Sequence, residues 1–186
     1  MHEGDRVVGG FGDAVICKNL KDQQLYVAKR NKEAKHDAGA SLEMQFMLKV
    51  KHAHVLRVKE GFWSPAEKGL VMLTEYCPLG SLEGQLKARM DKKESVYRLR
   101  KFSEPLVRIC LHDMLQGLCH LSAHKMAHCD IKPANLLMSD AGDRFKYHRL
   151  VIADFGVSRL LAGSEEIRTH PIGTPRFFSP ELKCKE

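Results

Sequence analysis

Short runs of hydrophobic residues, separated by glycine-rich or polar turns, occupy the first part of the chain. Residues 7–8 and 14–17 flank a glycine turn and predict a β-hairpin, and residues 25–28 predict a further strand after a polar turn. Residues 70–74 form another apolar run, bounded by Gly69 and by Pro78-Leu79-Gly80. This bounded run predicts a buried strand.

The middle of the chain changes to a helical pattern. Ser103-Glu104-Pro105 predicts a helix start, with a capping serine followed by an acid and a proline in the first turn. From residue 106 to residue 121, 10 of 16 residues are apolar, and they cover about half of the helix surface. So wide an arc predicts a central helix that needs cover from more than one neighbour.

Two shorter elements complete the pattern. A helix is predicted over residues 41–51, where Glu43, Met47 and Val50 share one face. A short strand is predicted over residues 150–153. Strands first and helices later favour an α+β arrangement in two parts.

Composition narrows the class of protein. The chain has 186 residues, of which 44% are hydrophobic and 28% charged, which excludes a disordered or fibrous chain and suits one domain or one two-lobed domain. No apolar run reaches the ~18–20 residues that span a bilayer, and residues 1–6 lack the apolar core of a signal peptide. The six cysteines form no Cys-x-x-Cys pair and are expected to be reduced thiols. We therefore expect a location in the cytoplasm or the nucleus and no membrane partner.

The net charge of +7 is concentrated in one stretch. Residues 87–101 hold seven basic and two acidic residues, which is typical of a solvated loop. Aromatic residues do not alternate with these charges, so we do not expect nucleic acid as a partner. A zinc site near His120, His124, His128 and Cys129 is an alternative, but no second cysteine pair completes it.

Four segments taken together resemble a eukaryotic protein kinase. They are Gly9-Gly10-Phe11-Gly12, His128-Cys129-Asp130-Ile131-Lys132-Pro133-Ala134-Asn135, Asp154-Phe155-Gly156, and Gly173-Thr174-Pro175 with Ser179-Pro180-Glu181. In detail the chain looks most like the NIMA-related serine/threonine kinases, through Tyr26-Val27-Ala28-Lys29, Glu75-Tyr76-Cys77 and residues 173–181. The resemblance covers nearly the whole chain.

The resemblance implies a fold, a reaction and a set of site residues. The fold is a kinase-like α+β fold with a small β-rich N-lobe (1–73), a hinge (74–80) and an incomplete, mainly helical C-lobe (81–186). The reaction is transfer of the γ-phosphate of ATP, with Mg²⁺, to a Ser or Thr hydroxyl of a protein substrate. Asp130 would accept the proton of that hydroxyl and Lys132 would neutralise the moving phosphoryl group. Asn135 and Asp154 would supply hard oxygen ligands to Mg²⁺.

The ATP-binding residues implied by the resemblance come from both lobes. The glycines would lie against the phosphates, and Glu43 would pair with the lysine that holds the α- and β-phosphates. Thr74 would guard the adenine pocket, the backbones of Glu75 and Cys77 would bind the adenine edge, and Leu137 would pack beneath it. The full set is Gly9, Gly10, Gly12, Lys29, Glu43, Thr74, Glu75, Cys77 and Leu137.

Two parts of the ATP-binding pattern depart from the family. If Gly12 is the third glycine of the glycine loop, Val7 replaces the first and Ala14 replaces the usual valine; if Val15 is that valine, the loop has shifted register. The strand lysine is either Lys29 or, by a second alignment, a position held by Arg30. Alternate strand residues face opposite sides, so only one of the two faces the nucleotide; we favour Lys29.

The catalytic and activation segments also depart from the family. Cys129 replaces the arginine that reads a phosphate on the activation loop, so we expect little or no dependence on phosphorylation there. Thr169 and Thr174 are candidate modification targets, although Thr174 is expected to contact the catalytic loop. The chain stops five residues after Glu181, so we expect the second lobe to be incomplete. The apolar arc over residues 106–121 is then expected to form a hydrophobic patch that favours aggregation or a partner that covers it. These departures leave a second function open, that of a catalytically impaired pseudokinase serving as a binding or scaffold module.

Overall fold

The computed structural model describes residues 6–9, 12–31, 44–45, 47–66, 69–90, 102–140, 148–161 and 172–183. The chain divides into two compact units. The first comprises Met1–His52 and Leu56–Tyr76, and the second comprises Ala53–Val55 and Cys77–Glu186. The division between Tyr76 and Cys77 falls inside the stretch expected to be the hinge. Residues 53–55, which the sequence placed in the first lobe, lie instead with the second unit.

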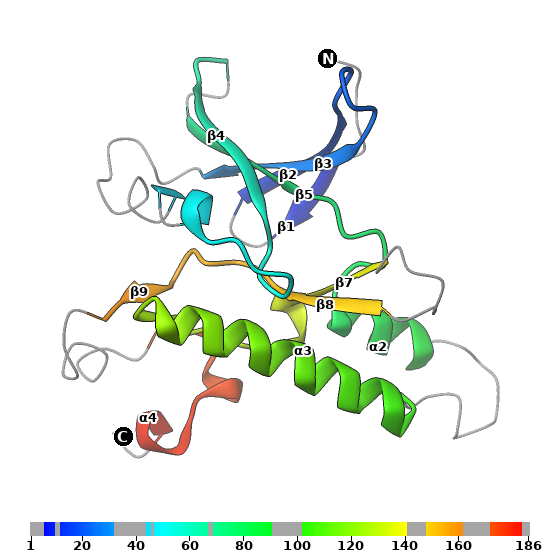
Figure 1. Ribbon diagram of the computed structural model, residues 1–186, viewed down its shortest axis with the longest axis vertical. Helices are drawn as coiled ribbons and strands as arrows, with labels where there is room; N and C mark the ends of the chain where they lie inside the picture. The colour runs from blue at the N-terminus through cyan, green and yellow to red at the C-terminus, as the bar shows by residue number, and fades with distance from the viewer. Residues whose placement is uncertain are drawn as a thin grey trace. The chain divides into compact units, whose positions relative to one another are not determined.

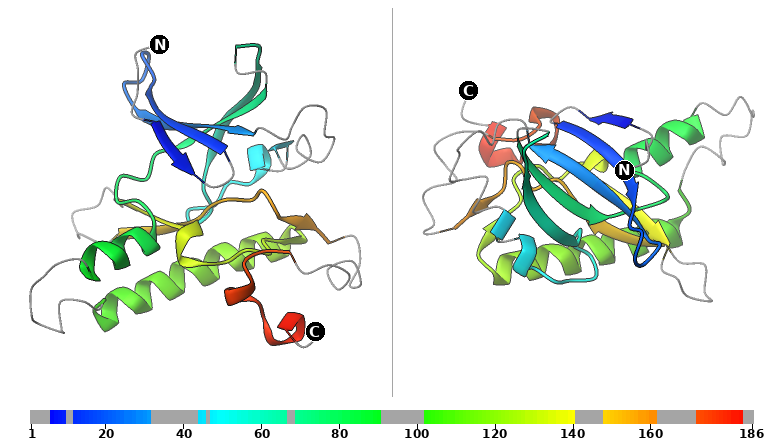
Figure 2. Two further views of the ribbon diagram at one scale, coloured as in Figure 1. Left: turned by 180° about the vertical axis from the view of Figure 1, so that it is seen from behind. Right: turned by 90° about the horizontal axis from the view of Figure 1, so that it is seen from above.

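The first unit is built on one antiparallel sheet of five strands, in the order β1-β2-β3-β5-β4 (Figure 1). The sheet twists along its width (Figure 2). The predicted strands at residues 7–8, 14–17, 25–28 and 70–74 correspond to β1, β2, β3 and β5, whereas β4 was not predicted. The strands are β1 (Arg6–Gly9), β2 (Gly12–Lys18), β3 (Leu25–Asn31), β4 (Val58–Ser64) and β5 (Gly69–Glu75).

The pairing register assigns side chains to the two faces of this sheet. Val27 of β3 lies opposite Thr74 of β5, and Lys29 lies opposite Met72. Directly opposed residues share a face and alternate residues share a face. Lys29 therefore lies on the same face as Thr74, whereas Arg30 lies on the face that carries Tyr26.

Strand β4 contains an irregularity that the sequence did not reveal. Val58 pairs with Thr74 and Glu60 pairs with Leu73, so Lys59 is an extra residue with no partner across the ladder. Such a β-bulge bends the strand and redirects the side chain at that point. The Lys59 side chain crosses the sheet to Tyr26, with its Nζ 4.1 Å from the centroid of the Tyr26 ring.

The second unit contains the long helix α3 beside the hairpin formed by β7 and β8 (Figure 1). Helix α3 and strand β8 were predicted, whereas α2 and β7 were not. Within the described residues no helix is long and apolar enough to cross a membrane. The elements are α2 (Leu82–Met90), α3 (Glu104–Ala123), β6 (Met126–Ala127), η2 (Pro133–Asn135), β7 (Leu136–Asp140), β8 (His148–Ile152), β9 (Arg159–Leu160), η4 (Pro175–Phe177) and α4 (Pro180–Lys183).

A buried carboxylate joins α3 to β8. Asp113 Oδ2 accepts the backbone N–H of Leu150 at 3.0 Å and lies 3.5 Å from Nδ1 of His54. The same His54 nitrogen donates to the carbonyl of Leu150 at 2.9 Å, and the His54 carbonyl accepts the N–H of Ile152 at 3.0 Å. These bonds explain why residues 53–55 belong to the second unit: they run alongside β8 as an added segment.

The apolar arc of α3 is only partly covered among the described residues. Leu121 is 1% exposed, but Val107, Leu111 and Leu115 are 41%, 49% and 55% exposed. The expected hydrophobic patch is therefore present on this helix. Ser103 occupies the N-cap position as predicted, but its side chain makes no capping hydrogen bond. The helix start thus depends on the extended backbone of Ser103 and on Pro105 in the first turn.

We predict that Gly117→Ala destabilises the second unit. A Cβ at Gly117 would lie 2.6 Å from the His54 carbonyl oxygen and 2.8 Å from Cδ1 of Ile152, so helix and strand must separate. Overpacking of this kind costs about 1–3 kcal/mol and lowers the melting temperature by several degrees.

The matched control is Gly84→Ala in α2, where the nearest atom to an added Cβ is Ser81 Oγ at 3.4 Å. Removal of a helical glycine there leaves stability unchanged or raises it by up to about 1 kcal/mol. Equal melting temperatures for the two variants would contradict the assigned contact at Gly117.

Candidate functional site

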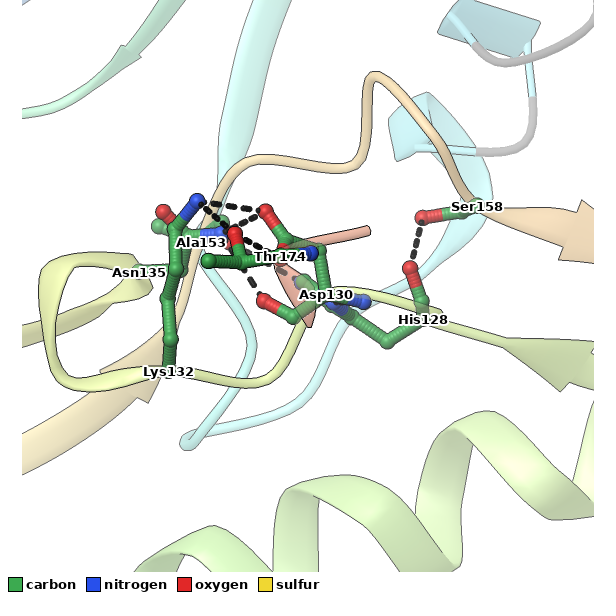
Figure 3. Close-up of polar contacts among 7 residues, drawn as sticks. All are labelled: His128, Asp130, Lys132, Asn135, Ala153, Ser158 and Thr174. Atoms are coloured by element: carbon green, nitrogen blue, oxygen red, sulfur yellow. Dashed lines mark hydrogen bonds and ion pairs between the residues drawn. The ribbon is translucent and has the colours of Figure 1, made fainter. Parts of the chain in front are cut away.

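The candidate site is centred on the carboxylate of Asp130, which is 7% exposed. Its Oδ1 accepts the backbone N–H of Thr174 at 2.9 Å and the hydroxyl of Thr174 at 2.8 Å. Its Oδ2 lies 2.7 Å from Nζ of Lys132. Figure 3 shows these groups converging from two segments that are far apart in the sequence. The expected contact of Thr174 with the 128–135 loop is confirmed.

Asn135 completes this arrangement from the end of the loop. Its Nδ2 donates to the backbone oxygen of Asp130 at 2.9 Å and to the Asp130 carboxylate at 3.0 Å. Lys132 Nζ also donates to Thr174 Oγ1 at 2.8 Å. Three predicted site residues, Asp130, Lys132 and Asn135, are therefore brought together, and each is fixed by a second polar contact.

These contacts determine the charge of Asp130. Burial alone would raise the pKa of its carboxyl group, but the hydrogen bonds from Lys132 and Thr174 outweigh burial, and the pKa lies below its usual value. The carboxylate is therefore ionised at neutral pH. A buried anion beside an ammonium group and a hydroxyl is suited to orienting another hydroxyl placed against it.

His128 holds the start of the loop in place. Its ring is 3% exposed; Nε2 donates to the carbonyl of Ala153 at 3.0 Å, and Nδ1 accepts the N–H of Asp130 at 3.2 Å. Burial lowers the pKa of this imidazole, so it is neutral and fixed as one tautomer. Phe155 packs edge-on against the ring, with the centroids 4.9 Å apart. Sequence analysis considered His128 only for the zinc alternative and not as a support for this loop, although its place two residues before Asp130 was the available signal.

Unusual backbone conformations surround Asp130. Cys129 and Asp154 have φ angles of 65° and 66°, which are uncommon for residues other than glycine. Gly173 has a φ of 114°, and a Cβ there would lie 2.3 Å from the carbonyl oxygen of Cys129. Only glycine allows this approach, and the approach delivers Thr174 to Asp130. Such conformations concentrate at functional sites.

Cys129 contributes a thiol where the kinase pattern has arginine. Its Sγ donates weakly to the carbonyl of Ala127 at 3.6 Å. Burial raises the pKa of this thiol, and Arg159 only partly offsets the rise. The side chain is therefore neutral and supplies no positive charge. The expectation of little dependence on activation-loop phosphorylation stays a prediction, and Thr169 lies outside the described residues.

Asn135 and Asp154 are the predicted metal ligands. The N–H of Ala153 donates to the backbone oxygen of Asn135 at 2.9 Å. Because Asp154 follows Ala153 directly, this bond keeps the two predicted ligands close together. Because Nδ2 of Asn135 is used on Asp130, its side-chain oxygen is the atom left for a cation. Two oxygen donors of this kind fit Mg²⁺, which takes few protein ligands. Among the described residues no group of three His, Cys, Asp or Glu is placed to hold a metal, so the zinc alternative is not supported.

The predicted ATP-binding residues are divided between the two units. In the first unit Gly9 and Gly12 are paired across the β1–β2 hairpin. Thr74 is buried, and its hydroxyl donates to the carbonyl of Val27 at 3.4 Å. Glu75 Oε1 accepts the N–H of Arg57 at 2.9 Å. Gly10 and Glu43 lie outside the described residues.

In the first unit Lys29 also lies in β3, opposite Met72. Two further predicted residues, Cys77 and Leu137, lie in the second unit. Cys77 is buried, and its carbonyl accepts the N–H of Gly80 at 3.1 Å. Leu137 lies in β7 opposite Val151 and forms an isolated bridge with Ser81. Both residues are thus held by backbone hydrogen bonds or pairing within the second unit.

Comparison with known proteins identifies the family to which the chain belongs. The model of the protein kinase domain matches residues 8–185, and the chain belongs to the protein kinase family. It is similar to the serine/threonine-protein kinase Nek1 of Mus musculus, with 29% identity over 178 residues, 94% of this chain and 14% of that protein. It is also similar to Nek3 of Mus musculus, with 27% identity over 175 residues, 94% of this chain and 31% of that protein.

These matches confirm the predicted resemblance to NIMA-related serine/threonine kinases and the kinase-like α+β fold class. The chain spans less than a third of the length of either mouse protein.

We predict that Thr174→Val raises the pKa of Asp130. Valine keeps the shape of threonine but removes the hydroxyl that helps to lower this pKa. The carboxyl group can be followed by carbon-13 NMR during a pH titration. The native carboxylate stabilises the fold above the unfolded-state pKa of about 3.9, and this stabilisation is lost as the pH falls through the native pKa. The variant should therefore gain less stability between low and neutral pH.

Ser158→Ala is the control, because it removes only the contact of the Ser158 hydroxyl with the His128 carbonyl at 3.5 Å. An unchanged Asp130 titration in Thr174→Val would show that the hydroxyl does not set the pKa of this carboxyl group.

Proposed function

We propose that this chain is the phosphate-transferring part of a serine/threonine protein kinase, which moves the γ-phosphate of ATP to a protein hydroxyl. The observation that carries the proposal is the ionised Asp130 carboxylate, held by Lys132, Asn135 and Thr174. Phosphoryl transfer needs a positioned hydroxyl and neutralised charge more than covalent help. The site offers both within one loop.

Asp130 receives the substrate hydroxyl as a hydrogen-bond donor and accepts its proton as the oxygen attacks phosphorus. Its low pKa makes positioning of the hydroxyl its main contribution, since a weak base removes a proton late. Lys132, 2.7 Å from Asp130, places a positive charge next to the transferred group. Thr174 keeps both side chains aligned when no substrate is bound.

Asn135 and Asp154 would hold Mg²⁺, which neutralises phosphate charge when bound. The remaining roles are distributed over the nucleotide. Gly9, Gly10 and Gly12 would approach the phosphates, with Lys29 and Glu43 as the ion pair that orients them. Thr74, the backbones of Glu75 and Cys77, and Leu137 would contact the adenine.

The sheet register supports Lys29 over Arg30 for the phosphate-binding role. Lys29 shares a face with Val27 and Thr74, whereas Arg30 lies on the other face with Ala28. Thr74 is the residue proposed to line the adenine pocket, so the nucleotide-binding cation belongs on its face. A lysine ammonium is also a compact point charge suited to phosphate oxygens.

The transfer of labelled phosphate from ATP and Mg²⁺ to a mixture of Ser/Thr-containing proteins tests the reaction. Asp130→Asn should reduce transfer by at least about 100-fold, the range expected for loss of a general base. Glu83→Gln, which alters a surface pair with Lys87 in α2, should leave transfer unchanged.

Transfer that survives Asp130→Asn would refute the role of Asp130. No transfer by the unsubstituted chain, together with nucleotide binding, would favour the second candidate, a pseudokinase that serves as a binding module. The neutral Cys129 and the irregular glycine loop are the observations that favour this alternative.

Thermal melting with ATP, with and without Mg²⁺, tests whether Lys29 or Arg30 binds the phosphates. A ligand present at 100 times its dissociation constant adds about 2.7 kcal/mol to the free energy of unfolding. At this chain length that raises the melting midpoint by roughly 5–11 °C. Lys29→Met should abolish most of this rise, and Arg30→Met should retain it. The reverse result would assign the phosphate-binding role to Arg30.

A further inference from the structure

Strand β8 ends two residues before Asp154, one of the two residues proposed to hold Mg²⁺. Leu150, Val151 and Ile152 in this strand are at most 1% exposed. Every backbone N–H and carbonyl in so buried a segment needs a partner, and the partners decide where the strand lies. Because one residue separates Ile152 from Asp154, a displacement of β8 would displace Asp154 as well.

The Leu150 peptide groups take their partners from two side chains. On one side β8 is paired with β7, where Val151 lies opposite Leu137. Away from that pairing, Asp113 Oδ2 accepts the Leu150 N–H at 3.0 Å, and His54 Nδ1 donates to the Leu150 carbonyl at 2.9 Å. A carboxylate and an imidazole therefore occupy the places that a neighbouring strand would fill with its backbone.

The two side chains also contact each other. Asp113 is 7% exposed, and its Oδ2 lies 3.5 Å from His54 Nδ1. Its Oδ1 lies 3.4 Å from Nδ1 of His112. A carboxylate only accepts hydrogen bonds, so it can face the N–H groups of Leu150 and His54 together, whereas an amide would direct its own N–H groups at one of these neighbours. The residue type thus matches its surroundings.

Polar contacts continue from this point to the candidate site. The Ile152 N–H donates to the His54 carbonyl at 3.0 Å. The Ala153 N–H donates to the carbonyl of Asn135 at 2.9 Å, and the Ala153 carbonyl accepts from His128 Nε2 at 3.0 Å. The chain between Leu150 and Asp154 is therefore held at successive residues, and Asp113 holds the end farthest from the site.

We propose that Asp113 is a positioning residue for the metal site, which acts on Asp154 through β8. The inference rests on the proposed function, since that function assigns Mg²⁺ to Asn135 and Asp154. Without the Asp113 carboxylate the buried Leu150 N–H loses its acceptor and pays its full desolvation cost, so the strand shifts toward another acceptor. Mg²⁺ demands near-ideal octahedral geometry and tolerates a displaced ligand poorly.

The Mg²⁺ dependence of ATP binding tests this role. Calorimetric titration of the full chain with ATP, repeated over a series of Mg²⁺ concentrations well below the melting midpoint, gives the Mg²⁺ concentration for half-maximal affinity. Asp113→Ala should raise this concentration at least about tenfold, as loss of an outer partner of a metal ligand does. Asp113→Asn should raise it less, because one oxygen remains for the Leu150 N–H.

Leu121→Val is the control for a general loss of stability. Leu121 is a 1% exposed residue of the same helix with an apolar side chain. The variant should melt at a lower temperature and keep the Mg²⁺ requirement of the unsubstituted chain. A second measurement needs neither metal nor nucleotide: the amide NMR signals of Ala153 and Asp154 in the free chain should move in Asp113→Asn and stay in place in Leu121→Val.

An unchanged Mg²⁺ requirement in both Asp113 variants would overturn the inference, and so would an equal change in Leu121→Val. If ATP binding by the unsubstituted chain does not depend on Mg²⁺, the metal part of the proposed function fails. The NMR signals then decide the positioning role, which is wrong if Ala153 and Asp154 are unmoved in Asp113→Asn. Phosphate transfer is measured in neither experiment, so the role of Asp130 holds or fails independently.

Discussion

The Asp130 carboxylate is the point at which the second unit is tied together around its candidate site. A buried anion is costly unless donors surround it, and here the donors come from three positions in the chain, Lys132, Asn135 and Thr174. Each donor is fixed by a further contact, so the carboxylate organises the loop that carries it and the segment that begins at residue 172. The same bonds that make burial of the charge tolerable also make it ionised and oriented. Stability and chemistry therefore depend on one group.

Backbone geometry sets how closely these segments can approach. The positive φ angles of Cys129 and Asp154 turn the chain on both sides of the carboxylate, and neutral His128 joins the two turns through Asp130 and Ala153. Gly173 allows the carbonyl of Cys129 to lie where a side chain would otherwise be. The arrangement tolerates a cysteine at 129 because that side chain is not among the groups that hold Asp130.

Features of the fold that depend on residues close together in the sequence could be predicted, and features that depend on distant residues could not. Strands β1, β2, β3 and β5 and helix α3 could be predicted because local apolar patterns and turn residues define them. Strand β4 could not, because Gly61 and charged residues interrupt its apolar pattern, and α2 has no buried residue to produce a periodic signal. The grouping of Asp130, Lys132 and Asn135 was implied by the resemblance of residues 128–135 to a protein kinase motif. The placement of Lys29 and Arg30 on opposite faces of the sheet, with Lys29 on the face of Thr74, depends on the pairing of β3 with β5, which no local pattern encodes.

The bulge at Lys59 has a consequence for chain length. Two residues of β4 oppose one position of β5 there, so loss of residue 59 would restore an ordinary ladder and leave Val58 and Phe62 on their present sides. Loss of a residue elsewhere in the strand would exchange the two faces for everything beyond it. At position 59 of β4 a deletion would therefore remove the contact between Lys59 and Tyr26 and leave the pairing of the sheet intact.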